Sequence, residues 1–264
     1  MNLQSYFIDT HAHIYLAEFD ADRDNVIEAA LHRGVKHIFM PNIDSTSIES
    51  MNTVAGRYPG VCYPLMGLHP TSVKENYRDE LARVEYEMEQ RNYYGIGEIG
   101  IDLYWDKSHL KEQSLVFSKQ LDLSLQYNLP VIIHARESFP EILEILEGYR
   151  NRGLKGIFHA FTGTMDIAEQ VISMGFMLGI GGILTYKNST LPDVIRETGL
   201  VSLVLETDSP YLAPVPFRGK RNESSYIPYI AEAVKQILNI TLNEVARVTK
   251  YNALTLFSSD HAKP

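Results

Sequence analysis

Five of the nine histidines in this sequence of 264 residues stand where a short apolar run ends. Imidazole nitrogens and carboxylate oxygens are common protein ligands of catalytic metal ions. Random placement would scatter histidines over loops and helix surfaces, as it does for His32 and His109, so the repeated position indicates one shared site. Six runs deliver side chains of ligand type in this way: His11, His13, His69, Glu98, His134, His159 and Asp208.

The spacing of the histidines predicts shared ligation. His11 and His13 are two residues apart, so in a persisting strand both rings project to one side and can chelate one ion. His134 and His159 close equivalent apolar runs, and they are neighbours in space if those runs form consecutive strands. A lone histidine in such a run is ordinarily a core residue bonded to the backbone. The repetition favours ligands.

Three carboxylates complete the predicted centre. Glu98 lies in an apolar, glycine-rich run, where a carboxylate is costly to bury unless it is paired or bound to metal. The alternative is a surface glutamate at the end of a strand. Glu206 and Asp208 also have i, i+2 spacing. One of them can ligate metal and take a proton from water while the other orients a histidine or water, and the spacing leaves open which does which.

Basic and aromatic residues near these ends suggest contacts with substrate. A cluster within residues 218–222 predicts a phosphate clamp beside a metal site, although such a run is usually a solvated loop. Tyr104, Trp105 and Phe161 could stack on bases or serve as lids. The candidate substrate contacts are His69, Arg136, Arg218, Lys220, Arg221 and Asn222.

The elements that must position these side chains alternate along the chain. The expected strands are Tyr6–Asp9, Val35–Met40, Val61–Leu68, Tyr93–Glu98, Pro130–His134, Lys155–His159, Phe176–Ile180 and Leu203–Glu206. Helical periodicity predicts helices over Asp22–Arg33, Leu110–Tyr127, Ser138–Arg150, Ser225–Leu238 and Leu242–Phe257, the last with a Thr241/Glu244 capping box.

Eight strands separated by helices predict a single (β/α)8 TIM barrel of the metal-dependent hydrolase type, spanning residues 1–264 as one domain. The alternative, an open doubly wound sheet, predicts a glycine-rich turn after the first strand. The segment from Asp9 to His13 contains no glycine, which favours the barrel. Active-site groups of such barrels lie at the C-terminal ends of the strands, where the candidate ligands fall.

The composition excludes several classes of protein. With 45% hydrophobic and 22% charged residues the chain is not disordered, and the single cysteine excludes disulfides within the chain. The net charge of −9 argues against broad coating of nucleic acid. No secretory signal or membrane-length apolar stretch is evident, so we expect a cytoplasmic protein without membrane contact.

Seven segments, in order, resemble the TatD family of metal-dependent hydrolases in the amidohydrolase-like superfamily. They are Asp9–His13, Gly67–Pro70, Gly97–Asp102, Pro130–Arg136, His159–Gly163, Leu205–Tyr211 and Pro216–Asn222. The resemblance implies two metal ions, one held by His11, His13, Glu98 and Asp208 and the other by Glu98, His134 and His159. Family members are described as magnesium- or manganese-dependent DNases. Ala160 and Ser224 depart from the usual Cys and Pro, without touching an implied ligand.

The resulting hypothesis is a deoxyribonuclease that hydrolyses phosphodiester bonds, as a 3′–5′ exonuclease on single-stranded DNA. Water activated by two divalent ions attacks phosphorus, and Asp208 accepts the proton, with Glu206 as a second catalytic carboxylate. Mg²⁺ or Mn²⁺ is expected in function, and the imidazoles also suit Zn²⁺. The alternatives are a hydrolase of a small amide or lactone and a non-catalytic metal-stabilised binding protein. No obligate protein partner is evident.

Overall fold

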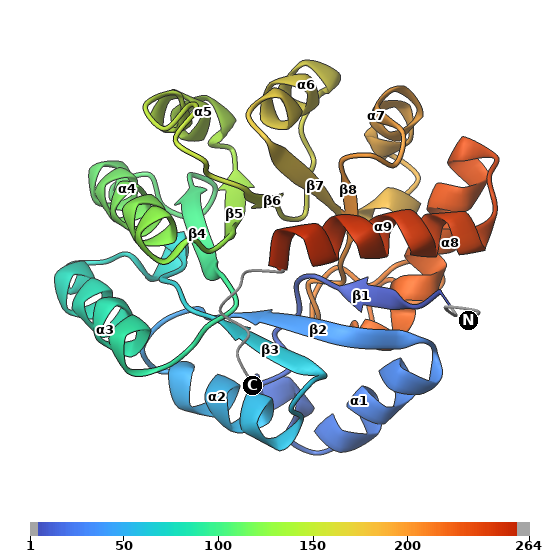
Figure 1. The fold of residues 1–264 in the computed structure, drawn as a ribbon, viewed down its shortest axis with the longest axis horizontal. Helices are drawn as coiled ribbons and strands as arrows, with labels where there is room; N and C mark the ends of the chain where they lie inside the picture. Colours follow the sequence, from blue (N-terminus) through green and yellow to red (C-terminus); the bar gives the residue numbers. More distant parts are fainter. Residues whose placement is uncertain (1–4, 258–264) are drawn as a thin grey trace.

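The apolar runs form eight parallel strands in the computed structural model, which describes residues 5–257 (Figure 1). They are β1 (Phe7–Asp9), β2 (Val35–Pro41), β3 (Cys62–Leu65), β4 (Ile96–Asp102), β5 (Val131–Arg136), β6 (Gly156–Phe158), β7 (Phe176–Ile180) and β8 (Leu203–Leu205). Each strand pairs with the next in parallel within the groups β1–β3 and β4–β8. The predicted strands are therefore confirmed in number and order.

Two junctions close these groups into a barrel. A parallel bridge joins Met66 to Ile96 between β3 and β4. On the other side, the Thr10 N–H donates to the carbonyl of Leu205 at 3.0 Å, and a parallel bridge pairs Ala12 with Ser209. The predicted (β/α)8 barrel is confirmed, and the ends of β1 and β8, far apart in sequence, lie side by side.

Helices surround the barrel (Figure 1). They are α1 (Arg23–His32), α2 (Ile48–Arg57), α3 (Tyr77–Gln90), α4 (Leu110–Tyr127), α5 (Phe139–Glu147), α6 (Met165–Ser173), α7 (Leu191–Thr198), α8 (Ile227–Leu238) and α9 (Leu242–Phe257), with short 3-10 helices at Ala17–Phe19, Pro70–Ser72, Gly182–Thr185 and Ser224–Tyr226. The capping residue Thr241 accepts a hydrogen bond from the Glu244 N–H at 3.1 Å, as predicted. Within residues 5–257, no helix combines the length and apolarity needed to cross a membrane.

Four helices were not predicted from the sequence: α2, α3, α6 and α7. In α3, most residues are polar, but Leu81, Val84 and Met88 are buried on one face. Their spacing of three and four residues is a helical signal that could have revealed the helix. Each of these helices connects two strands that were predicted from the sequence, and together they complete the outer layer of helices.

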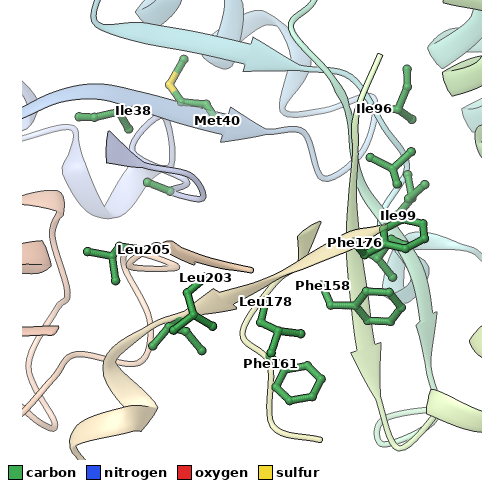
Figure 2. Close-up of a cluster of buried hydrophobic side chains, with 14 of the residues drawn as sticks. Ile38, Met40, Ile96, Ile99, Phe158, Phe161, Phe176, Leu178, Leu203 and Leu205 are labelled. Carbon is green, nitrogen blue, oxygen red and sulfur yellow. The ribbon is translucent and has the colours of Figure 1, made fainter. Parts of the chain in front are cut away.

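The apolar residues divide into an inner and an outer layer. Ile132, Ile157 and Val204 pack in one cluster with residues from other strands, which is possible only inside the barrel, and Leu256 and Phe257 of α9 pack against them. Neighbouring side chains such as Phe158 face the helices, as Figure 2 illustrates for part of this outer layer. Because strand side chains alternate, the inward positions two residues after Ile132, Ile157 and Val204 are His134, His159 and Glu206.

The expected position of Glu98 at the end of its strand was wrong. The observed strand β4, Ile96–Asp102, begins and ends later in the chain than the expected strand Tyr93–Glu98. Its register with β5 shifts between Ile96 and Ile99, so that the pleat is interrupted at Glu98. Gly100, at φ +139°, lets β4 approach β5 closely, since a Cβ there would lie 2.0 Å from the carbonyl oxygen of His134. A strand predicted from apolarity alone stops too early because it cannot include this glycine-rich bulge.

The single cysteine gives a first testable consequence of this packing. Cys62 lies in β3 with 3% of its surface exposed, and burial raises the pKa of its thiol to about 12. Since the thiolate is the reactive form, its population at pH 8 is about 10³-fold below that of a free thiol. We expect an aromatic disulfide reagent to label native protein at least about 100-fold more slowly than protein in urea. Rapid stoichiometric labelling of the native protein would contradict this packing.

Candidate metal centre

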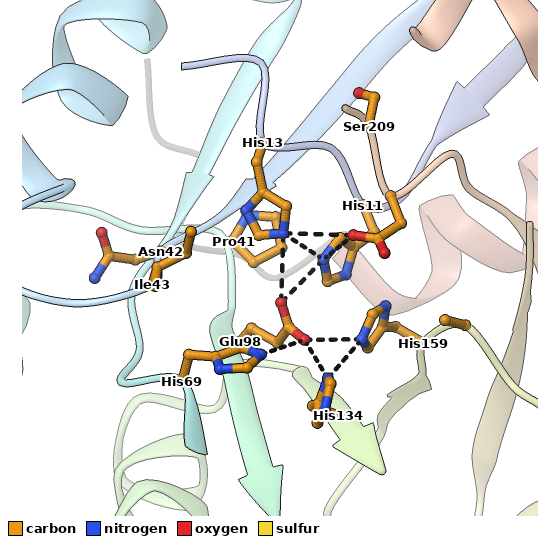
Figure 3. Close-up of polar contacts among 12 residues, drawn as sticks. His11, His13, Pro41, Asn42, Ile43, His69, Glu98, His134, His159 and Ser209 are labelled. Atoms are coloured by element: carbon orange, nitrogen blue, oxygen red, sulfur yellow. Dashed lines mark hydrogen bonds and ion pairs between the residues drawn. The ribbon is translucent and has the colours of Figure 1, made fainter. Parts of the chain in front are cut away.

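The fold brings the other five predicted ligands around the carboxylate of Glu98, and Figure 3 shows the four histidines among them. Glu98 Oε2 lies 3.1 Å from His11 Nε2 and 3.4 Å from His13 Nε2. The two imidazole nitrogens are 3.1 Å apart. Asp208 Oδ1 lies 3.6 Å from His11 and 3.5 Å from His13. These four side chains therefore converge on one point beside Oε2.

The other carboxylate oxygen faces a second set of donors. Glu98 Oε1 lies 2.8 Å from His134 Nδ1 and 2.8 Å from His159 Nε2. These two ring nitrogens are 3.2 Å apart. Each oxygen of one buried carboxylate thus faces a different set of imidazole nitrogens.

The separations fit a coordinated divalent ion. Ligands about 2.1 Å from an ion, at angles between 90° and 110°, stand about 3.0–3.4 Å apart. The observed separations in the two groups run from 2.8 Å to 3.6 Å. Three groups of donors within the described residues lie close enough to hold an ion: His11, Glu98 and His159; His11, His13 and Asp208; and His69, Glu98 and His134.

Tyr15 determines which nitrogen of His13 faces the centre. The Tyr15 hydroxyl donates to the carbonyl of Pro41 at 2.6 Å, so its only proton is used. His13 Nδ1, 3.0 Å from the hydroxyl oxygen, must then be the donor of the hydrogen bond between them. The neutral His13 ring therefore carries its lone pair on Nε2, the atom that faces Glu98 and Asp208. Contacts of this kind hold metal-ligating histidines in the required tautomer.

Asp102 fixes the tautomer of His134, as Tyr15 does for His13. No prediction from the sequence assigned a role to Asp102. His134 Nε2 donates to Asp102 Oδ2 at 2.8 Å, which leaves the lone pair of the neutral ring on Nδ1. That lone pair faces Glu98 Oε1, itself an acceptor, at 2.8 Å. Such an approach requires a second proton on the ring or a cation between the two atoms. The donor set therefore fits a divalent ion.

His69 presents a proton rather than a lone pair to the centre. Its Nδ1 accepts hydrogen bonds from the Thr71 hydroxyl at 2.7 Å and the Thr71 N–H at 3.1 Å. Burial lowers the pKa of His69, which favours the neutral ring with its proton on Nε2. This nitrogen lies 3.2 Å from Glu98 Oε1. The geometry is that of a hydrogen-bond donor at the centre, compatible with the predicted contact to substrate.

The structure separates Glu206 from Asp208. Asp208 lines the pocket above the ligands, whereas Glu206 is fully buried. Glu206 Oε1 accepts from the N–H of Ala160 at 2.5 Å and lies 3.6 Å from His159 Nδ1. Gly179 makes room for this carboxylate, because a Cβ there would lie 2.2 Å from Oε2. Glu206 therefore positions His159 and the backbone after it, while Asp208 can reach a substrate.

Replacing Glu206 by glutamine tests this positioning role. We expect Glu206→Gln to lower metal affinity and hydrolysis about 10- to 100-fold, the usual cost of losing a carboxylate behind a metal-ligating histidine. The pH dependence of kcat should keep its shape, since Glu206 does not reach the reacting atoms. A variant with unchanged metal affinity, measured by titration of the metal-depleted protein, would contradict the role.

The electrostatic environment keeps the carboxylates of Glu98 and Asp208 ionised. Burial favours the neutral acid of Glu98, but electrostatic interactions with the surrounding imidazoles, His159 foremost, hold its pKa well below the usual range. Burial also opposes ionisation of Asp208, yet its contact with His13 and the charges on His11 and His159 lower its pKa. Asp208 is thus available as a proton acceptor at neutral pH.

Five of the six ligand candidates, all except His11, line an open pocket of about 550 Å³. Among the residues that line it are Arg136, Trp105 and Tyr211. Arg136 lies at the pocket, as its candidate role in substrate binding requires. Phe161 is buried and packs against Phe139, so the expectation that its ring is available to stack on a base was wrong. The volume of the pocket lies within the usual range of sites for small molecules.

Two residues of the predicted phosphate clamp are held by other parts of the protein. Arg221 pairs with Asp22 at 2.7 Å and donates to the carbonyl of Glu18 at 2.6 Å. Asn222 is fully buried and donates to the carbonyls of Thr207 and Tyr211. Both residues fasten the loop to the barrel, so we do not retain them as substrate contacts.

Arg218 and Lys220 are the exposed cations of this loop. The Arg218 guanidinium lies over the Tyr186 ring, 4.4 Å from its centroid, and Lys220 is exposed. Among the described residues, no carboxylate oxygen lies within 4.0 Å of either cation. They remain candidates for phosphate contact, but neither lines the pocket.

Comparison with known proteins identifies a family model and relatives that match nearly the whole chain. A family model described as TatD related DNase matches residues 8–258. YabD of Bacillus subtilis is 36% identical over 250 residues, which are 94% of this chain and 98% of YabD. YjjV of Escherichia coli is 29% identical over 255 residues, or 96% of this chain and 98% of YjjV. Both relatives are described as uncharacterized metal-dependent hydrolases.

Solved structures share the fold. The crystal structure of YjjV, described as a TatD homolog, superposes with a TM-score of 0.90 at 29% identity over 96% of this chain and 98% of YjjV. A TatD family hydrolase of Entamoeba histolytica gives a TM-score of 0.82 at 24% identity, with 96% and 98% of the two chains covered. The Escherichia coli phosphotriesterase homology protein gives 0.72 at 15% identity over 97% and 99%. The last two similarities concern the fold alone.

Proposed function

Because this chain belongs to the TatD family of metal-dependent hydrolases, we propose that it hydrolyses phosphodiester bonds of single-stranded DNA from the 3′ end. The observation that carries the proposal is the shared carboxylate of Glu98, with one oxygen in each group of donors. Such a site suits two divalent ions, which we propose to be Mg²⁺ or Mn²⁺, with Zn²⁺ also compatible with the imidazoles. Two bound ions would supply Lewis acidity and lower the pKa of water at the site.

Asp208 is the proposed proton acceptor. Its side chain is 14% exposed and lines the pocket, so water and substrate can reach it. Its lowered pKa keeps it ionised before the reaction. A carboxylate so placed can accept a proton from the attacking water at Oδ1 or Oδ2. Glu206, buried behind His159, serves this step only by holding that histidine in place.

Two groups in the pocket are suited to a phosphate. His69 directs its Nε2–H toward the centre, and Arg136 contributes a guanidinium at the pocket wall. Hydrogen bonds from such donors to phosphoryl oxygens offset the charge that develops during phosphodiester cleavage. Arg218 and Lys220, farther out, would meet the following phosphates of a polymer.

The charge of the chain favours a short end of a strand over duplex DNA. The net charge is −9, so contacts outside the pocket with a polyanion are few and sensitive to salt. The proposed location is the cytoplasm, whose reducing environment suits a chain with a single buried thiol and no disulfide.

The experiment that tests this function uses metal-depleted protein re-supplied separately with Mg²⁺, Mn²⁺ and Zn²⁺. We expect at least one ion to restore cleavage of a chromogenic phosphodiester and of 3′-labelled single-stranded DNA, and a chelator to abolish both. Release of labelled mononucleotide first would support attack from the 3′ end, whereas longer labelled fragments would indicate an endonuclease.

Assays of the same metal-supplied protein on small amides and lactones identify the alternatives. Turnover of amides or lactones without any phosphodiester cleavage would replace the proposal by an amidohydrolase. Many such enzymes bridge their ions with a carboxylated lysine of the fourth strand. This chain has Glu98 within β4 instead, which favours phosphate chemistry. Protein that binds two ions and turns over none of these substrates would be a binding protein.

A further inference from the structure

The loop after β4 carries two exposed aromatic side chains to the rim of the pocket. Tyr104 is 50% exposed and Trp105 is 70% exposed. Their rings meet edge to face, with centroids 5.0 Å apart. Trp105 lines the pocket together with the metal-ligand candidates. An exposed indole contributes little to the stability of the fold, since its apolar surface stays in water.

Arg136, at the end of β5, lies against these rings. Its guanidinium is 3.8 Å from the Tyr104 centroid and 5.4 Å from the Trp105 centroid. Among the described residues, no carboxylate oxygen lies within 4.0 Å of it, in contrast to Arg221, which is paired with Asp22. The rim therefore combines an aromatic surface with an unneutralised planar cation, both of which stack on nucleobases.

Asp102 fixes this rim relative to the metal centre. Its Oδ1 accepts hydrogen bonds from the N–H groups of Tyr104 at 3.0 Å and Trp105 at 3.3 Å. Its Oδ2 accepts from His134 Nε2 at 2.8 Å. One buried carboxylate thus holds both the loop with its aromatic rings and a metal-ligand candidate. These contacts of Asp102 fix the position of the rim relative to His134.

We propose that Tyr104, Trp105 and Arg136 form a stacking shelf that binds an unpaired nucleobase next to the scissile phosphate. This inference rests on the proposed nuclease function and specifies its substrate. Stacking on Trp105 requires an open base face, so the shelf selects single strands over duplexes. It makes no hydrogen-bonded readout of base edges, so it should tolerate any base. Loss of one such contact weakens binding about tenfold to a hundredfold.

Trp105 reports directly on the shelf because it is the only tryptophan of the chain. We would titrate the protein with a phosphorothioate trinucleotide, which is cleaved slowly, and with an abasic trinucleotide of equal charge. A stacked base should quench most of the tryptophan emission, whereas the abasic compound should not. Arg136→Gln should weaken the binding that the quenching reports. Tyr86→Ala is the matched control, since Tyr86 also lies beside an arginine, 5.3 Å from Arg83, on the distant helix α3.

A kinetic comparison tests the same shelf without fluorescence. The substrates are two single-stranded oligonucleotides that differ only in whether the 3′-terminal residues carry bases. For the wild-type protein and Tyr86→Ala, kcat/KM should be at least tenfold higher on the oligonucleotide with bases. The ratio should fall toward one in Trp105→Ala, through KM, and stay high in Trp105→Phe, which keeps an aromatic face.

The outcomes separate this inference from the proposed function. Cleavage of both oligonucleotides with equal efficiency, together with equal quenching by both trinucleotides, would overturn the shelf and leave the nuclease standing. Base-dependent quenching without cleavage of any oligonucleotide would support the shelf and overturn the nuclease. If quenching were lost equally in Arg136→Gln and in Tyr86→Ala, general destabilisation of the protein would explain the loss. The shelf would then be rejected.

Discussion

The Glu98→Ala variant is expected to lose at least about 10³-fold in kcat/KM and to bind fewer divalent ions than the wild-type protein. Two bound metal ions supply several kcal/mol of transition-state stabilisation, and each 1.36 kcal/mol corresponds to a factor of ten in rate. Glu98 contributes an oxygen to each group of donors, so its removal damages both positions at once. Hydrolysis of the chromogenic phosphodiester and metal content after gel filtration measure the two losses.

A second buried glutamate serves as the control for Glu98. Glu87 in α3 is 4% exposed, accepts a hydrogen bond from the Tyr93 hydroxyl at 3.0 Å and pairs with Arg83. Glu87→Gln removes a buried charge far from the pocket, so activity and metal content should stay at wild-type level even if stability falls. Circular dichroism should show a folded barrel in both variants. Substantial metal-dependent hydrolysis by Glu98→Ala would refute the shared-carboxylate site.

Asp208→Asn is expected to lower kcat about 10²- to 10⁴-fold, the contribution typical of a positioned general base. Asparagine has nearly the same shape, and it tolerates the left-handed backbone of this position, where φ is 58°. The variant therefore keeps an oxygen near His11 and His13 but cannot accept the proton. Because Glu98, His134 and His159 are unchanged, at least one ion should still bind. Steady-state kinetics with metal content measured on the same samples test this.

The control for Asp208 is an exposed aspartate with a comparable substitution. Asp193 in α7 pairs with Arg196 at the surface, and Asp193→Asn should leave kcat unchanged. If Asp208→Asn retained more than about a tenth of wild-type kcat with its full metal content, another group would have to accept the proton. A loss of both ions in Asp208→Asn would instead make Asp208 a structural ligand first.

The eight-strand barrel could be predicted because its signal is local. Ile132 and His134 lie on the same face of β5, and Ile157 and His159 do so on β6, since side chains alternate along a strand. Once the strands are parallel and closed, these faces must converge at their C-terminal ends. The convergence of His134 and His159, separated by 25 residues, follows from periodicity and order alone.

The bulge in β4 and the contacts behind the ligands could not be predicted in this way. Glu98 faces the centre although its strand continues to Asp102, because glycines and a register shift interrupt the pleat. The roles of Tyr15 and Asp102 depend on hydrogen bonds to particular atoms of His13 and His134. Such contacts depend on distance and direction between side chains, and spacing along the chain contains neither.

The sequence by itself determined the chemical type of the site: imidazoles and carboxylates at the ends of apolar runs can bind cations wherever the strands meet. Only the tertiary structure decided how neighbouring residues of the same type divide their tasks. Glu206 is buried against Ala160 while Asp208 faces the pocket. Arg221 is paired with Asp22, whereas Arg136 has no carboxylate partner within residues 5–257. The reason is physical, since the role of a charged group depends on its burial and on its partners, which are contributed by distant parts of the chain.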